Sequence, residues 1–387
     1  MRAVALSLGG TKVRCASVFE GGGCRGLPAV SWRDRFGLRA DRPEDGDRLV
    51  DGMAGMAWEE WLRWEGEPVE IGLATKGPLK RVGEDLILGP GHRTENMPFL
   101  DFPIECRLRE SLVRRAPAGL CDAARRVALL VLHDGAACAT GEASSGGTCP
   151  GARDLSALIL GTGVGVGIRR DGAPWSGGGS PKTSVIGSFG RHAVFCCNPG
   201  GGLRYEWRGF PEGSTRAVLR ADECYGSDRL SGPALAELLA CEAAADPAWL
   251  LAMGFAGAAR DEIDRLARRE RRDEMKDLEA RLLAGLTAAA RKGHESSRRK
   301  LAAIGAELGW ALLAYAKAFP GEAFARRVVL VSTVAERLGV GVPGETTDDL
   351  LLECAQRVVS GEAVAVMRSA CPDRELLAFT PAGGKSD

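Results

Sequence analysis

The sequence predicts an α/β protein whose two lobes flank an interlobe cleft. One device occurs twice: an apolar strand, a glycine-rich turn and a second apolar strand, first over Ala3–Phe19 and again over Leu155–Arg170. Apolar runs bounded by glycine are typical of strands joined by a turn. A continuous apolar run such as Arg126–Asp134 suits a strand covered on both faces. Two similar halves of this kind indicate two lobes, each with a five-stranded mixed sheet, whose glycine hairpins face each other across the cleft.

The other expected elements follow in chain order. Pro68–Thr75 has the composition of a buried strand, and Leu100–Val113 mixes apolar and charged residues at helical spacing. Ser231–Phe319 is expected to be mostly helical, and Arg327–Val334 to be the last buried strand. Arg260–Arg299 predicts an amphipathic helix with a charged outer face, because its apolar residues recur largely at steps of three or four. These apolar residues are Ile263, Leu266, Leu278, Leu282 and Leu286.

The chain is long enough for two hydrophobic cores, since 45% of its 387 residues are hydrophobic. We expect residues 1–133 to form a small N-terminal lobe. Residues 134–345 are expected to form a larger lobe with a charged helical insertion at about 260–300. A C-terminal helix near Thr346–Val359, in the segment of about 346–387, is expected to cross back to the first lobe.

Composition argues against several classes of protein. Basic and acidic residues balance at 51 each, so nucleic acid is not an expected partner. No stretch approaches the roughly 20 apolar residues of a membrane span. The opening MRAVALSLGG lacks the charged start and the long apolar run of a signal peptide, and we expect a cytoplasmic protein that does not bind membranes. Its twelve cysteines are then mostly small, reduced hydrophobic residues.

Two glycine turns have the composition of phosphate-binding sites. Glycine lets backbone N–H groups approach a phosphate, and Gly9–Lys12 adds a hydroxyl and a cation to such a turn. Gly161–Gly163 offers the same kind of turn in the second half. Neither is the P-loop GxxxxGK[ST] that opens a helix. GTGVGVG is not a dinucleotide fingerprint either, because IRRDG continues it as a strand.

Asp134 follows a buried strand, at the strand end where ligand sites of α/β proteins tend to lie. A carboxylate there could accept the proton of a substrate hydroxyl as that hydroxyl attacks a phosphoryl group. The alternative is that Asp134 caps the helix that follows, a role for which aspartate is well suited. Taken by itself, the residue favours the helix cap.

Several segments together resemble one family. SLGGTK, LHDGAACATGE and LILGTGVGVGI resemble, in order and spacing, the first phosphate motif, the catalytic-Asp motif and the second phosphate motif of ROK proteins. IGLATKGPLK, NMPFLDFPI and LAAIGAELGWALLAYAKAFPGE resemble further segments of that family. ROK proteins are repressors and bacterial sugar kinases of the actin-like ATPase/hexokinase (ribonuclease H-like) superfamily. The resemblance extends over Arg2–Val359, in which Arg260–Arg299 reads as an insertion.

The resemblance implies roles for particular residues. Asp134 would be the general base and would contact the sugar, and Asn96 would hydrogen-bond sugar hydroxyls. The implied donor is ATP with Mg²⁺. The residues that would bind its phosphates are Gly9, Gly10, Thr11, Lys12, Gly161, Thr162 and Gly163.

The chain departs from the family near the implied metal and sugar. Ser7 stands where family kinases carry an aspartate that helps hold the metal through water, and a neutral hydroxyl is a poorer partner for a hard cation. Ser7→Asp is therefore expected to improve Mg²⁺-dependent nucleotide binding. His133 replaces an asparagine before Asp134. The Glu-x-Gly-His sugar clamp should fall near Ser184–Ser188, where both the glutamate and the histidine are missing.

Two further departures concern zinc and adenosine. The family's zinc motif, one histidine with three cysteines, is represented only by His192, Cys196 and Cys197. A closed zinc site takes four ligands, so we expect zinc to be absent and the cysteine pair to be structural. Val331-Ser332-Thr333 brings β-branched residues to the position of the family's adenosine-binding glycine turn.

Three kinds of function remain open. An active sugar kinase is favoured by Asp134 and both phosphate turns, whereas Ser7 and the missing clamp favour a pseudokinase that binds sugar or nucleotide as a regulator. A ROK repressor is least favoured, because the first strand begins at Arg2 with no DNA-binding segment before it. A polyphosphate donor has no support from the neutral net charge. The retained base tips the balance to the kinase, with a sugar as its partner and a homodimer by family analogy.

Overall fold

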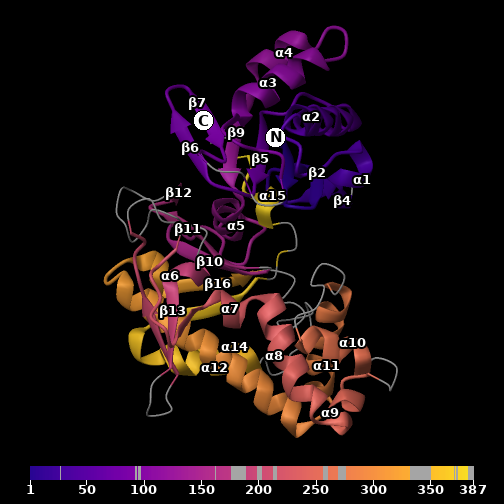
Figure 1. The fold of residues 1–387 in the computed structure, drawn as a ribbon. Coiled ribbons are helices and arrows are strands. Elements are labelled where there is room, and N and C mark those ends of the chain that lie inside the picture. The colour runs from indigo at the N-terminus through magenta and orange to yellow at the C-terminus, as the bar shows by residue number, and fades with distance from the viewer. Residues whose placement is uncertain are drawn as a thin grey trace. The chain divides into compact units, whose positions relative to one another are not determined.

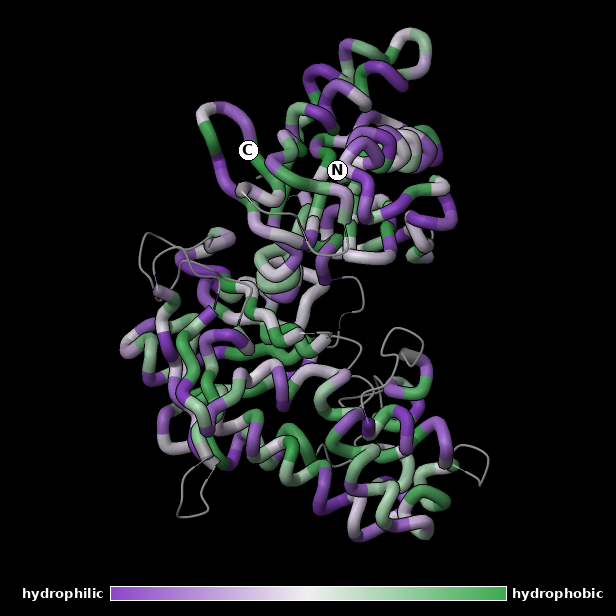
Figure 2. The backbone as a smooth tube through the Cα atoms, viewed as in Figure 1, coloured by the Kyte–Doolittle hydropathy of each residue, from purple (hydrophilic) through white to green (hydrophobic). Residues whose placement is uncertain are grey.

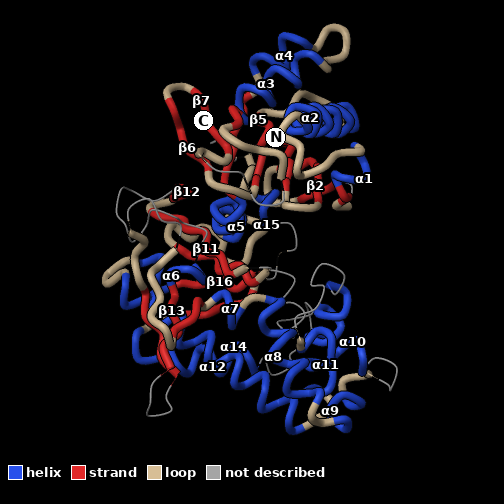
Figure 3. The backbone as a smooth tube through the Cα atoms, in the orientation of Figure 1, coloured by secondary structure: helices blue, strands red, loops and turns tan. Residues whose placement is uncertain are grey.

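The computed structural model describes the chain except residues 27, 92–93, 95–96, 162, 176–188, 198–202, 212–215, 256–259, 269–275, 332–349, 370, 372–373 and 382–387. Helices and strands alternate along it (Figure 1; Figure 3), which confirms the predicted α/β class. The chain forms two compact units. The first comprises Met1–Arg153, Gly172–Pro174 and Cys371–Asp387, and the second comprises Asp154–Asp171 and Trp175–Ala370.

The first unit is built on a six-stranded sheet in the order β3-β2-β1-β5-β9, with β4 paired to β2. β1 pairs antiparallel with β2 and parallel with β5, and β5 pairs parallel with β9. These strands are β1 (Arg2–Leu8), β2 (Lys12–Phe19), β3 (Cys24–Gly26), β4 (Val30–Ser31), β5 (Glu70–Thr75) and β9 (Ala128–His133). A small second sheet contains β6 (Leu79–Val82), β7 (Asp85–Leu88) and β8 (Phe102–Pro103). The helices are α1 (Trp32–Phe36), α2 (Asp45–Arg63), α3 (Ile104–Arg114), α4 (Cys121–Arg126), α5 (Asp134–Glu142) and α15 (Arg374–Leu377).

The two faces of this sheet carry side chains of different size. Along β1, Val4 and Leu6 belong to a large core that includes α2, whereas Ala3 and Ala5 face a small core that includes α15. This alternation follows from the two-residue period of a strand. The small residues leave room for the C-terminal segment, which packs on α5 and on β1, β2 and β5.

β9 differs from the expectation that it is covered on both faces. It is the last strand of the sheet order, and its burial alternates instead of being continuous. Leu130 is 38% exposed and Ala128 is also exposed. The expectation was wrong because a continuous apolar run does not distinguish a central strand from an edge strand.

The second unit contains a five-stranded sheet in the order β12-β11-β10-β16-β17 and a three-stranded sheet in the order β14-β13-β15. The strands of the larger sheet are β10 (Leu155–Leu160), β11 (Val164–Arg170), β12 (Ala173–Trp175), β16 (Arg327–Val331) and β17 (Ala365–Arg368). Those of the smaller sheet are β13 (Ala193–Cys197), β14 (Leu203–Trp207) and β15 (Glu223–Tyr225). The repeat seen in the sequence is confirmed, because β10 pairs antiparallel with β11 and parallel with β16, as β1 pairs with β2 and β5.

Helices make up most of the rest of the second unit. They are α6 (Phe189–His192), α7 (Ser227–Leu230), α8 (Gly232–Ala244), α9 (Pro247–Ala252), α10 (Arg260–Ala267), α11 (Lys276–Arg291), α12 (Glu295–Ala318) and α14 (Leu350–Val359), with 3₁₀ turns η3 (Ala323–Arg326) and η4 (Ser360–Glu362). The charged segment 260–299 thus forms α10, α11 and the start of α12 instead of one helix. Its five apolar residues are buried, as the amphipathic pattern predicts, and hydrophobic and hydrophilic stretches alternate along these helices (Figure 2).

The units divide the chain differently from the expected lobes. The boundary falls after Arg153 and not after His133, so α5 stays with the first sheet. The helix expected to cross back, α14, packs instead against α12 in the second unit, where Gly305 and Gly309 allow the two helices to approach closely. The segment that returns to the first unit begins at Cys371. Among the described helices only α12 is long and apolar enough to span a membrane, and 61% of its apolar window is buried inside the protein.

Candidate functional site

The first glycine turn joins β1 to β2 and is held by Trp32. The backbone N–H of Gly9 donates to the carbonyl of Lys12 at 2.9 Å. The Trp32 indole Nε1 donates to the carbonyl of Gly9 at 3.2 Å, and the Trp32 backbone N–H donates to that of Thr11 at 3.3 Å. Trp32 itself is fully buried. Trp32 therefore fixes the turn from its buried side, while Thr11 and Lys12 are exposed.

Glycine is not required by the chain's own conformation at two of the predicted positions. Neither Gly9 nor Gly161 has a φ in the left-handed region. A Cβ added at Gly9 would lie 3.7 Å from its nearest neighbour, the carbonyl oxygen of Lys12, and one at Gly161 would lie 4.0 Å from the carbonyl oxygen of Gly163. Both are ordinary contact distances. Glycine at these positions thus leaves the backbone open to a group from outside the chain, as phosphate binding requires.

The second turn joins β10 to β11 and is bound to the start of α8. Gly161 donates from its N–H to the carbonyl of Gly163 at 2.9 Å, and Gly232 donates to the carbonyl of Gly161 at 2.8 Å. Gly232 is the first residue of α8, whose N-cap is Ser231. The partial positive charge of a helix N-terminus therefore lies beside this turn, an arrangement that favours anions. The helical character of this segment was expected from Ser231 onward, but the hydrogen bond between the start of α8 and the Gly161 turn was not. Thr162 lies outside the described residues.

Asp134 is the first residue of α5 and follows the N-cap residue of that helix. The N-cap residue is His133, whose Nδ1 accepts a hydrogen bond from the N–H of Gly135 at 3.1 Å. Asp134 Oδ1 accepts from the same N–H at 2.7 Å and lies 3.2 Å from His133 Nδ1. The Asp134 side chain is 30% exposed. His133 is thus the N-cap residue of α5, and Asp134 shares the capping hydrogen bond with it.

The turn and Asp134 lie at the same edge of the first sheet. In the register of the parallel strands, Leu8 is opposite Thr75, and Thr75 is opposite His133. The carboxyl ends of β1, β5 and β9 therefore form a row, with adjacent strands about 4.8 Å apart. The structure thus brings Gly9–Lys12 and Asp134 to one edge of the sheet, as an α/β ligand site requires.

A carboxyl group that sequence reasoning missed reaches this edge from α15. The hydroxyl of Ser7 is hydrogen-bonded to Oε2 of Glu375, and the thiol of Cys138 donates to Oε1 of Glu375 at 3.7 Å. Burial raises the pKa of Glu375 above its ordinary value, and the negative charge of Asp134 raises it further. No local pattern could have indicated this pairing, because Ser7 and Glu375 are 368 positions apart.

The donors at this edge fit a hard cation held through water. Hydroxyl and carboxyl oxygens of Ser7, Asp134 and Glu375 are of the kind that Mg²⁺ prefers. Mg²⁺ keeps several water ligands and takes few from the protein, so it does not require a closed protein cage. Within the described part of the chain, no group of three or more His, Cys, Asp or Glu side chains is arranged to hold a metal ion directly.

His192 lies in an aromatic stack of the second unit. Its ring centroid lies 3.7 Å from that of Phe210 and 4.8 Å from that of Trp207, with nearly parallel planes. Its Nδ1 lies 2.7 Å from the carbonyl oxygen of Arg208. The thiol of Cys196 donates to Glu223 at 3.5 Å, and burial is the main reason that the pKa of Cys196 rises to about 11. Zinc binds the thiolate, which this environment disfavours. The side chain of Cys197 lies outside the described part.

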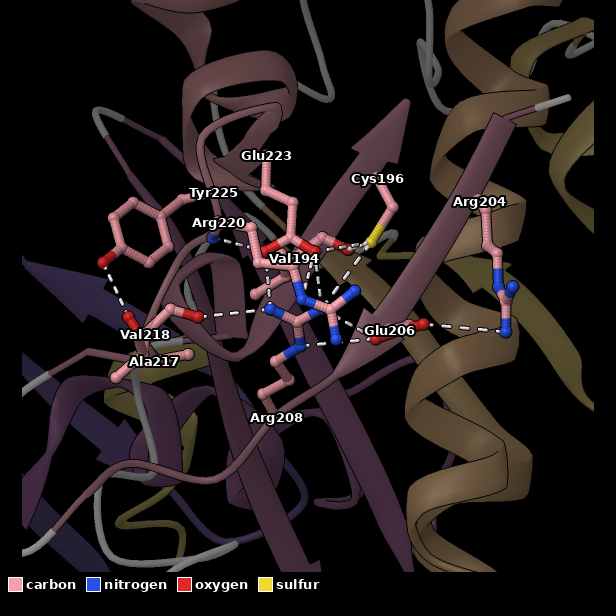
Figure 4. Close-up of polar contacts among 10 residues, drawn as sticks. All are labelled: Val194, Cys196, Arg204, Glu206, Arg208, Ala217, Val218, Arg220, Glu223 and Tyr225. Atoms are coloured by element: carbon pink, nitrogen blue, oxygen red, sulfur yellow. Dashed lines mark hydrogen bonds and ion pairs between the residues drawn. The ribbon is translucent and has the colours of Figure 1, made fainter. Parts of the chain in front are cut away.

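An ion-pair network ties the three-stranded sheet together at Cys196 (Figure 4). Arg208 donates through both terminal nitrogens to the two oxygens of Glu223, each at 2.6 Å, and to Glu206 at 2.8 Å. The Glu223 side chain is 2% exposed, and the Arg208 guanidinium lowers the pKa of Glu223 to about 2. Arg208 thus bridges the end of β14 to β15 beside Cys196.

Most of the remaining positions predicted from sequence are not described by the structure. Asn96, the clamp segment 184–188, Ser332 and Thr333 lie outside the described residues. Val331 ends β16 and is 1% exposed, so its side chain is part of the core of the second unit.

No family model matches the sequence, and no curated protein matches it. Solved structures match over almost the whole chain. A ROK family glucokinase from Streptomyces griseus in complex with glucose and AMPPNP matches with a TM-score of 0.60 and 16% identity, covering 98% of each chain. A ROK hexokinase from Thermus thermophilus matches with a TM-score of 0.54 and 20% identity, covering 98% of this chain and 97% of that one. A ROK family transcriptional regulator, a homologue of the E. coli MLC protein, matches with a TM-score of 0.62 and 12% identity, covering 98% and 76%.

These similarities define the fold of the chain. It is the fold of ROK proteins, within the actin-like ATPase and hexokinase class, and the predicted fold class is confirmed. The particular structures similar to it include both sugar kinases and a transcriptional regulator. The fold therefore does not decide between enzyme and regulator, and that distinction depends on the residues of the site.

Proposed function

We propose that the chain is a divergent ROK sugar kinase, which transfers a phosphoryl group from ATP to a hydroxyl of a hexose or sugar-like alcohol. The observation that carries this proposal is the position of Asp134. It lies at the carboxyl end of β9, in a row with the Gly9 turn, and its side chain is 30% exposed. A partly exposed carboxylate at this edge of the sheet suits a general base.

Each residue of the proposed site has a separate task. Asp134 accepts the proton of the attacking hydroxyl. The Gly9–Lys12 turn receives the transferred phosphate, because its backbone is open and the Thr11 and Lys12 side chains are exposed. The Gly161 turn, with the N-terminus of α8 bound to it, receives the nucleotide's other phosphates. Bound Mg²⁺ would neutralise charge on the phosphates, and the oxygens of Ser7 and Asp134 are suitable partners for its water ligands.

The main alternative is a catalytically impaired pseudokinase that binds sugar or nucleotide as a regulator. Ser7 favours it, because the hydroxyl offers no charge to a cation. In both cases we propose a cytoplasmic protein whose partner is a small sugar and neither nucleic acid nor membrane, and a homodimer by analogy with the family.

Asp134→Asn tests the proposal. Asparagine keeps the shape of the side chain but cannot take the proton, so turnover should fall by about 10²- to 10⁴-fold while sugar affinity changes little. Phosphoryl transfer, sugar affinity and melting temperature should be measured together, with the exposed Asp122→Asn on α4 as the matched control. Substantial turnover in Asp134→Asn would contradict the mechanism. A wild type without turnover on any sugar, in which Asp134→Asn alters binding alone, would identify the pseudokinase.

A further inference from the structure

α15 carries a carboxyl group to the end of β1 and holds it there. Both oxygens of Glu375 are engaged, one by the hydroxyl of Ser7 and the other by the thiol of Cys138. The segment that follows is anchored, because Phe379 is 2% exposed and a Cβ on Gly72 of β5 would overlap its ring. The position of the Glu375 carboxyl therefore depends on packing across the sheet and not on one hydrogen bond.

Two carboxyl groups converge where the Gly9 turn lies. Cys138, whose thiol donates to the Glu375 carboxyl, lies on α5 about one helical turn after Asp134. Only β5 separates β1, which ends at Ser7 and Leu8, from β9, which leads into Asp134. A phosphate bound at the turn would add further negative charge to the same edge. Like charges that gather at one place are stable together when a cation lies among them, and a bound cation is often the largest local charge in a phosphate site.

We propose that Glu375 supplies the carboxylate that Ser7 lacks, and that together with Asp134 it positions the Mg²⁺ of a bound nucleotide through water. This inference rests on the proposed kinase function and adds to it a residue from the C-terminal segment. Ser7 then holds the Glu375 carboxyl, and the site is complete only when α15 is docked. Outer partners of this kind typically change metal affinity 10- to 100-fold when they are removed.

The test removes the carboxylate from α15 by Glu375→Gln and places one on β1 by Ser7→Asp. Affinity for ATP is measured by calorimetry with and without Mg²⁺ for the wild type, Glu375→Gln, Ser7→Asp and the Ser7→Asp/Glu375→Gln double variant, with Glu67→Gln as an exposed control in the same unit. Glu375→Gln should lose about 10- to 100-fold of the enhancement by Mg²⁺ and keep its affinity for ATP without metal. The double variant should recover the enhancement. Because the double variant still carries the Glu375→Gln change, the recovery cannot come from repaired packing of α15.

Two results would overturn the inference: full Mg²⁺ enhancement in Glu375→Gln, or a double variant no better than Glu375→Gln. Phosphoryl transfer is measured in parallel and separates this inference from the proposed function. The wild type could lack turnover while its Mg²⁺ enhancement of ATP binding is lost in Glu375→Gln and recovered in the double variant. That result would contradict the kinase function and support the role of Glu375. Turnover in the wild type, together with an unchanged Mg²⁺ enhancement in Glu375→Gln, supports the kinase function and contradicts the role of Glu375.

Discussion

Gly9→Ala separates a glycine kept for a ligand from one kept for the fold. The φ of Gly9 lies outside the left-handed region, and an added Cβ would lie 3.7 Å from the carbonyl oxygen of Lys12, an ordinary contact. The folded chain therefore accepts alanine. Replacing glycine at a position with compatible backbone stabilises a protein by about 0.4–1 kcal/mol through the unfolded state. The melting temperature of Gly9→Ala should consequently stay the same or rise slightly.

The effect on ligand binding should be opposite in sign. The new Cβ would stand between the backbone of the turn and a phosphate. One hydrogen bond to a charged group is worth about 1.5–3 kcal/mol. Its loss corresponds to a decrease in ATP affinity of about 10- to 150-fold. Calorimetric titration with ATP and Mg²⁺ measures this decrease, and differential scanning calorimetry measures the melting temperature.

Two other glycines calibrate the result. A Cβ at Gly361 would meet no described atom within 4 Å. Gly361 lies in η4, far from both glycine turns in the sequence, so Gly361→Ala should change neither quantity. A Cβ at Gly141 would overlap the carbonyl of Arg374, so Gly141→Ala should lower the melting temperature by displacing α15. If Gly9→Ala bound ATP as the wild type does, or lost stability as Gly141→Ala does, the ligand-facing interpretation of the turn would be wrong.

The remaining predictions concern the second unit. Glu223→Gln should lower the free energy of unfolding by about 3 kcal/mol at neutral pH, because it leaves the Arg208 guanidinium without its main partner. Since the folded pKa of Glu223, about 2, lies below its ordinary 4.5, this contribution is present above pH 4.5 and is lost as the pH falls to 2. Chemical unfolding at several pH values, with the exposed Glu353→Gln as control, measures this loss of unfolding free energy and the pH range in which it occurs. A loss at pH 2 as large as that at neutral pH would contradict the prediction. Metal analysis of protein purified without added zinc should find well under one equivalent, whereas stoichiometric zinc that is lost in His192→Ala would show that the Cys196 environment was misjudged.

The fold was predictable from sequence because its signals are local. Each strand–turn–strand device occupies fewer than twenty consecutive residues, and its repetition alone indicated two similar sheets. The boundary between the two units and the order of strands in the sheets were harder to predict from sequence. The apolar run that ends at Asp134 gave the correct strand, but its place at the edge of the sheet depends on which strand pairs with β5, and that is a long-range choice. The same holds for α14, whose sequence gives a helix but not its partner α12.

Ser7 shows where sequence reasoning about a site reaches its limit. Read along the chain, Ser7 is a lost carboxylate, and Ser7→Asp should restore it. In the folded unit, Glu375 already lies against the Ser7 hydroxyl. An aspartate at position 7 would therefore place two carboxyl groups in contact beside Asp134, and each would oppose the ionisation of the others. Because Glu375 already supplies a carboxylate there, Ser7→Asp should improve Mg²⁺-dependent binding less in the wild type than in Glu375→Gln. A residue that departs from a family pattern is thus not evidence of lost function until the structure shows what lies next to it.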